Sequence, residues 1–227
     1  AVLAFAYFTK DVESFPIRTL RTGTFASTGL PLSVISPTSP ASQNPEGTCG
    51  NPEGCWEISE LGNGPGADLE GYELSFQAPF SSIFGIDNAF LSNLGFIGNY
   101  TYVDSEVLYN YSGNPVKERL IGLSNDSYNA TLYWENDVFG ARVSWASRSD
   151  WLQSGPNRSG NLWQFADGTT YVDFAASYQI NDSLELTFQA TNLTDESSEF
   201  FVDTDANRRL EEYTTGTNYL FGARYIF

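Results

Sequence analysis

The sequence has no histidine and only two cysteines among its 227 residues. Without histidine there is no Ser-His-Asp triad and no Cys-His pair for nucleophilic catalysis. The carboxylates show no spacing typical of an acid/base pair, and the glycine-rich residues 62–66 lack the lysine of a phosphate-binding loop. We therefore expect a protein that is not an enzyme and has no cofactor and no metal site.

Basic residues are also scarce, since 11 Lys and Arg stand against 28 Asp and Glu and give a net charge of −17. Nucleic-acid binding depends on a surface rich in Lys and Arg. The charge therefore argues against a nucleic-acid partner and disfavours a polyanionic ligand. Its simplest explanation is the solubility of long polar loops.

No stretch approaches the roughly 20 apolar residues that a membrane helix needs. The chain also lacks methionine, and residues 1–8 show neither the basic region nor the cleavage site of a secretory leader. We expect the first residue to lie inside a longer protein or to result from processing.

The two cysteines, Cys49 and Cys55, lie close together in a stretch rich in Gly, Pro and Asn. This spacing favours a small loop closed by a disulfide in an oxidising compartment. Two free thiols or a partial metal site remain the alternative, although a zinc site would need acidic ligands to complete it.

Aromatic residues, in contrast, are abundant at 15% of the chain, and they form a stripe at its end. In steps of two, Tyr219, Phe221, Tyr225 and Phe227 share one face of the last ten residues with Ala223. Such a strand would be a sticky exposed edge in a soluble protein. It suits a transmembrane β-barrel, whose outer face meets lipid.

Other segments alternate in the same way between apolar and polar side chains. Val172, Phe174 and Tyr178, for example, alternate with Asp173 and Ser177. A soluble β-sandwich alternates too, but segments of about ten residues with aromatic residues near their ends favour a membrane barrel. The strand-like segments are residues 1–9, 14–22, 67–79, 90–104, 127–136, 138–148, 170–180, 183–194 and 217–227.

The connections between these segments alternate between short and long, as do the periplasmic turns and outer loops of outer-membrane barrels. The short ones are residues 10–13, 80–89, 136–137 and 181–182, and the long ones are 23–66, 105–126, 149–169 and 195–216. We predict an all-β, antiparallel transmembrane barrel. Because about nine strands cannot close an even-numbered barrel, residues 1–227 are expected to be its C-terminal portion.

Several motifs along the chain resemble the late barrel of TonB-dependent receptors. They are residues 71–73 (GYE), 98–105 (GNYTYVDS), 127–135 (SYNATLYWE), 169–173 (TTYVD) and 192–196 (NLTDE). The resemblance implies a 22-stranded barrel in a Gram-negative outer membrane, plugged by an N-terminal domain that this chain does not contain. It also implies import of a scarce nutrient with energy from TonB.

The sequences of these motifs are similar to those of the receptor branch found in Caulobacter- and Xanthomonas-like bacteria, which is often linked to oligosaccharides. We therefore prefer an oligosaccharide ligand, with a ferric siderophore as the alternative and a non-transporting surface protein as the second alternative. The implied partners are the TonB complex through the missing N-terminal region, outer-membrane lipid and lipopolysaccharide, and the outer-membrane assembly machinery.

Specificity is expected in the long loops, where aromatic rings stand beside polar groups that suit a sugar. The alternative is that these rings belong to the outer girdle or pack loop against loop. The candidates for ligand binding are Trp56, Trp151, Trp163, Phe165, Asn157 and Arg158.

Charged residues give weaker predictions. Arg208, Arg209, Glu211 and Glu212 form a run in the last long loop that is either solvated or contacts substrate or lipopolysaccharide. Inward-facing charges are expected to line the lumen or contact the plug. These are Glu135, Arg142, Asp173, Glu185 and Arg224.

The resemblance also implies that the terminal aromatic residue, Phe227, is recognised by the assembly machinery. We predict that deleting Phe227 from the whole receptor lowers membrane insertion and leaves the ligand affinity of the inserted fraction unchanged. Quantifying the receptor in isolated outer membranes checks this, and normal insertion would contradict it.

Overall fold

A computed structural model describes residues 1–39, 56–85, 88–111, 114–155, 163–202 and 208–227. The chain divides into two compact units, one made of Ala1–Asp11 with Ala67–Phe227 and the other of Val12–Gly66. In the described part of the chain no helix is long and apolar enough to cross a membrane.

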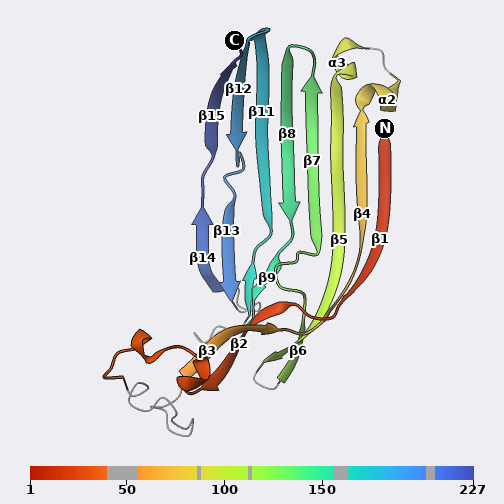
Figure 1. Cartoon of the computed structure of the whole chain (residues 1–227). Helices are drawn as coiled ribbons and strands as arrows, with labels where there is room; N and C mark the ends of the chain where they lie inside the picture. The colour runs from red at the N-terminus through yellow and green to blue at the C-terminus, as the bar shows by residue number, and fades with distance from the viewer. Residues whose placement is uncertain (40–55, 86–87, 112–113, 156–162, 203–207) are drawn as a thin grey trace. The chain divides into compact units, whose positions relative to one another are not determined.

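The larger unit is built on one long antiparallel sheet of nine strands (Figure 1). Eight strands follow one another in the order β1-β4-β5-β7-β8-β11-β12-β15, and β6 pairs with β5 beside this path. The two edge strands, β1 and β15, do not pair with each other among the described residues, so the sheet is an open piece of barrel wall. The strands are β1 Val2–Val12, β4 Ala67–Pro79, β5 Leu94–Tyr111, β6 Asn114–Glu118, β7 Asp126–Glu135, β8 Phe139–Arg148, β11 Thr169–Asn181, β12 Leu184–Thr191 and β15 Asn218–Tyr225.

The register of the sheet gathers its apolar side chains on one face. Val143 of β8, for example, lies opposite both Leu132 of β7 and Phe174 of β11. This face is open: Leu132 is 44% exposed, Val143 42% and Phe221 78%. So large an apolar surface would be a liability in water but matches a wall that faces lipid. The predicted all-β membrane-barrel fold class is confirmed.

Aromatic rings form a continuous row across this apolar face. Tyr72 of β4 stacks on Tyr102 of β5 at 5.3 Å between ring centres, and Tyr100 stacks on Tyr128 of β7 at 5.5 Å. Trp145 of β8 continues the row at 6.3 Å from Tyr128. Amphipathic rings gathered at one level of the wall are typical of the aromatic girdle at a membrane interface.

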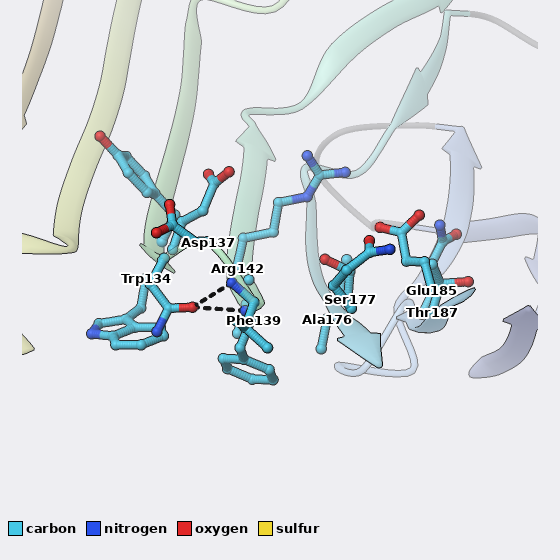
Figure 2. A pocket seen from close by; sticks show the side chains of 17 residues that line it. Trp134, Asp137, Phe139, Arg142, Ala176, Ser177, Glu185 and Thr187 are labelled. Carbon is cyan, nitrogen blue, oxygen red and sulfur yellow. Dashed lines mark hydrogen bonds between the residues drawn. The ribbon is translucent and has the colours of Figure 1, made fainter. Parts of the chain in front are cut away.

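Two of the short turns use the same side-chain chemistry. The Asn136 Oδ1 accepts hydrogen bonds from the amides of Val138 and Phe139, at 2.9 and 2.7 Å (Figure 2). The Asn181 Oδ1 accepts in the same way from Ser183 and Leu184. An asparagine side chain that replaces backbone partners stabilises a tight reversal. The third short connection holds two small helices, α2 Phe80–Phe84 and α3 Ala89–Ser92.

A second, four-stranded sheet continues four neighbouring strands of the wall and is called the outer sheet below. Its order, β14-β13-β10-β9, repeats that of β15, β12, β11 and β8, from which each strand is separated by only a few residues. Parts of the two loops predicted at residues 149–169 and 195–216 are therefore strands. They are β9 Trp151–Ser154, β10 Gln164–Ala166, β13 Ser197–Val202 and β14 Arg208–Thr214.

The smaller unit contains β2 Pro16–Gly23 and β3 Trp56–Asn63, paired antiparallel, with the short 3-10 helices η1 Ala26–Thr28 and η2 Leu32–Val34. The segment predicted as strand 14–22 is indeed a strand, but its place in the wall is wrong. Residues 10–13 are not a periplasmic turn, because β1 pairs directly with β4. Period-two alternation also occurs in a loop hairpin, here supported by an Arg21–Glu60 ion pair of 3.0 Å.

Candidate functional site: the rim between wall and outer sheet

Asn192 organises the boundary between the wall and the outer sheet. Only 5% of its surface is exposed, and its backbone adopts a left-handed φ of 56°. Its Nδ2 donates to the carbonyl oxygen of Glu196 at 3.0 Å, and its Oδ1 accepts from the Glu196 amide at 2.8 Å. Asparagine tolerates this backbone conformation better than most residues, and its short amide reaches both groups.

Neighbours of Asn192 extend the link to two adjacent strands. The Asn192 amide donates to Asp173 Oδ1 at 2.8 Å, and Thr194 Oγ1 donates to the carbonyl of Thr170 at 2.9 Å, both on β11. Thr217 Oγ1, just before β15, donates to the Asn192 carbonyl at 2.8 Å. The Asn-Leu-Thr motif therefore ties three strands together where they pass into the outer sheet.

Arg148, the last residue of β8, forms the centre of a second cluster at the same boundary. Its guanidinium lies 3.8 Å from the ring centre of Trp151, a close cation–π contact. Its Nε donates to Ser124 Oγ at 2.8 Å and its Nη2 to the Gly122 carbonyl at 2.9 Å. By strand alternation Arg148 shares the polar face of β8 with Arg142.

The segment that Arg148 holds, residues 119–124, is called the strap below. Arg119, at its start, forms an ion pair with Asp150 Oδ2 and donates to the Asp150 carbonyl at 2.9 Å. Ser124, at its end, is 7% exposed and donates to the Ser149 carbonyl at 2.6 Å. Two arginines and one serine thus fasten the strap to the junction between β8 and β9.

The strap covers a small core formed by the loops. Leu152 is fully buried, Val107 is 1% exposed and Phe165 is 5% exposed. The buried Tyr109 hydroxyl donates to the Arg119 carbonyl at 3.2 Å and accepts from the Ile121 amide at 3.1 Å. Burial raises the pKa of the Tyr109 phenol, so this hydroxyl stays protonated at neutral pH and keeps its donor role.

Two of the predicted ligand-binding rings lie in or beside this core. Phe165 stacks on Phe201 with 5.7 Å between ring centres, and the Arg119 Cζ lies over the Phe165 ring, 5.6 Å from its centre. Trp163 meets Tyr109 edge to face at 5.4 Å. Phe165, at 5% exposure, therefore presents little surface to a ligand, because its ring packs inside the protein.

Trp151 differs from these two rings. It is half-buried, its Nε1 donates to Gln153 Oε1 at 2.9 Å, and Gln153 itself is exposed. The boundary between the wall and the outer sheet, called the rim below, therefore combines an aromatic ring with hydrogen-bonding groups at this end of the polar face.

At the opposite end of the polar face, beside the short turns, lies a hollow of about 410 Å³. Figure 2 shows Arg142 and Glu185 projecting from this face, away from Trp134 and Phe139. Glu185 is paired with Arg224 at 3.3 Å across β12 and β15. Arg142, Glu135 and Glu185 line this hollow.

The family comparison accounts for both the wall and its two faces. A family model described as TonB dependent receptor-like, beta-barrel, matches residues 2–193. The chain belongs to the TonB-dependent receptor β-barrel family. No curated protein and no solved structure matches it. Members of this family lie in the Gram-negative outer membrane and act as TonB-dependent transporters rather than enzymes.

The remaining predicted residues of the receptor are dispersed. Trp56 opens β3 in the smaller unit, where it meets the buried Phe25 edge to face at 5.5 Å. Phe227 is fully exposed and contacts Tyr225 at 5.6 Å between ring centres. Four predicted residues, Asn157, Arg158, Cys49 and Cys55, lie outside the described residues.

The charge run of the last loop is paired within the outer sheet of the receptor. Arg209 bridges Glu199 and Glu212, at 2.8 and 2.6 Å. Tyr213 donates to Glu211 at 2.8 Å. One of these contacts crosses from β14 to β13 and two lie within β14, so pairing inside the outer sheet explains the charge run and a ligand is not needed to account for it.

Sequence reasoning missed the strap of the receptor and the part that Arg148 plays in it. Arg119 and Ser124 stand in a stretch without strand periodicity, and their partners are about 25 to 31 residues away. The only local signal was Arg148 preceding Trp151 in the sequence.

Proposed function

We propose that this receptor imports an oligosaccharide and that Trp151 is the ring on which a sugar stacks. The observation that carries the proposal is the half-buried indole beside the exposed Gln153 at the rim. Sugar rings present apolar C–H faces to an aromatic surface, while nearby amides bind their hydroxyl groups.

The contacts of Trp151 support this role because they hold the ring before a ligand arrives. Arg148 lies against the indole at 3.8 Å, and Gln153 accepts from its Nε1. A ring fixed in this way loses little conformational entropy on binding. Trp163 is less suited, because its ring already packs against Tyr109. Trp56, Asn157 and Arg158 stay candidates from the sequence.

We also propose that the chain is the C-terminal part of a 22-stranded barrel whose plug domain receives energy from TonB. The unpaired edges of β1 and β15 support this, because a strand edge in lipid leaves backbone groups without partners. Further strands beside both edges would close the wall.

Replacing Trp151 with alanine is expected to weaken oligosaccharide binding about 10- to 100-fold, as for an aromatic anchor of an interface. Phenylalanine at the same position should retain part of the affinity. The measurement is glycan binding by the whole receptor in detergent, together with growth of a deletion strain that carries each variant.

Tyr213→Ala serves as the matched control, since Tyr213 is also aromatic, 56% exposed and on the outer sheet. Its affinity should equal that of the unaltered receptor. Unchanged binding by the Trp151→Ala variant would contradict the stacking role. Import of a ferric siderophore without any glycan binding would show that the substrate is an iron chelate rather than an oligosaccharide.

A further inference from the structure

Arg148 is a partly buried cation without an acidic partner among the described residues. Three other arginines of the larger unit are neutralised, since Arg119 pairs with Asp150, Arg209 with Glu199 and Glu212, and Arg224 with Glu185. Arg142 also forms no ion pair within the described residues, but it is exposed to solvent, whereas Arg148 is partly buried. The contacts of Arg148 are instead a hydroxyl, a carbonyl and an indole. None of the three carries a negative charge.

Two of the three guanidinium nitrogens of Arg148 have hydrogen-bond partners. Nε donates to Ser124 and Nη2 donates to Gly122, while Cζ lies over the Trp151 ring, 3.8 Å from its centre. No hydrogen bond is formed by Nη1 within the described part of the chain. A guanidinium presents its donors in a fixed plane, so an acceptor at Nη1 would lie beside the indole.

The carboxylates near this cluster have other partners. Asp150 is bound by Arg119, and Asp126 Oδ1 accepts from the Tyr100 hydroxyl at 2.6 Å. Neither forms an ion pair with Arg148 in the described structure. A partly desolvated cation in this position would be stabilised by an anion that a ligand supplies.

We propose that Arg148 binds the carboxylate of a uronic acid residue whose ring stacks on Trp151, so that the receptor selects acidic oligosaccharides. This inference rests on the proposed oligosaccharide function. It names the class of sugar, since a neutral sugar would leave both the charge and the Nη1 donor unused. Gln153 is placed to bind a hydroxyl group of the same residue.

The net charge of −17 does not oppose a single carboxylate at this position. Charges separated by more than about 8–10 Å are largely screened at physiological salt. Next to Arg148, Asp150 is already paired with Arg119, and Asp126 is bound by the Tyr100 hydroxyl rather than by Arg148. A long polyanion would meet the remaining acidic loops and is disfavoured.

The test compares trimers of galacturonate, glucuronate and mannuronate with their methyl esters, which have the same rings without the charge. Binding is measured by calorimetry on the whole receptor in detergent. We expect at least one acid to bind roughly tenfold or more tightly than its ester, the size of a charge-assisted hydrogen bond. Arg148→Gln should abolish this ratio, and Arg148→Lys should retain part of it.

Ser124→Ala separates recognition from support of the strap, because it removes the partner of Nε and keeps the cation. The acid-to-ester ratio should survive this change. Equal binding of acid and ester, no binding of any uronate, or an unchanged ratio in Arg148→Gln would overturn the inference. Neutral glycans that bind through Trp151 alone would overturn it and leave the oligosaccharide function standing.

Discussion

Replacing Asn192 with alanine is expected to lower the stability of the folded barrel by about 2–4 kcal/mol. The change empties the buried position of the Asn192 side chain and leaves the amide and carbonyl of the half-buried Glu196 without these partners. Each unsatisfied buried group costs about 1–3 kcal/mol. Alanine also adopts the left-handed conformation of residue 192, with φ at 56°, less readily than asparagine.

Asn192→Gly is the matched control for backbone strain. Glycine adopts the left-handed conformation without strain but has no side-chain amide. Its variant should therefore regain only the part of the stability that alanine loses through backbone strain. The measurement is the temperature at which the whole receptor loses the altered gel mobility of a folded barrel. If both variants unfold at the temperature of the unaltered receptor, the Asn192 contacts do not hold the boundary.

Replacing Gly71 with alanine is the second change with a large expected effect, about 3 kcal/mol or loss of insertion. A Cβ at residue 71 of β4 would overlap the carbonyl oxygen of Tyr102 and lie 2.8 Å from Phe8 Cζ. Backbone in a paired strand cannot retreat as a side chain can, and overpacking of this kind typically costs about 1–3 kcal/mol. The strands β1, β4 and β5 would have to separate.

Gly140→Ala is the same substitution at a position with room. A Cβ at residue 140 of β8 would lie 3.3 Å from Ser177 Oγ and 3.8 Å from Glu135 Cγ, so small side-chain shifts accommodate it. We expect normal amounts of folded Gly140→Ala receptor and little of the Gly71→Ala form. Equal amounts of the two in isolated outer membranes would show that the strands at Gly71 are not tightly packed.

The wall of the barrel could be predicted from the sequence because each of its strands carries its own signal. Alternation at Val143 or Phe174 needs only neighbours two residues away, and the lipid requires it along the whole strand. The same signal misplaced residues 14–22, because a hairpin in a loop also alternates. Which strands pair depends on partners far along the chain, such as β1 and β4.

The candidate site was predictable only in part, for a related reason. Aromatic residues in a polar loop drew attention to Trp151, Trp163 and Phe165, but composition does not show which rings are buried. Which of these rings is buried depends on the strap, whose contacts join residues about 25 to 31 positions apart in the sequence. Asn192 was recognised as part of a motif, and only its contacts to β11 and β15 explain why an asparagine stands there.

The strap has a consequence for engineering. Arg119 and Ser124 belong to one loop of the receptor, while Asp150 and Ser149, to which they bind, belong to the next. The two loops are therefore a single module, and a chimera that exchanges one without the other separates every pair that joins them. Transplanting residues 119–124 together with 148–154 keeps these contacts within the graft, so new specificity should be transferred as this pair.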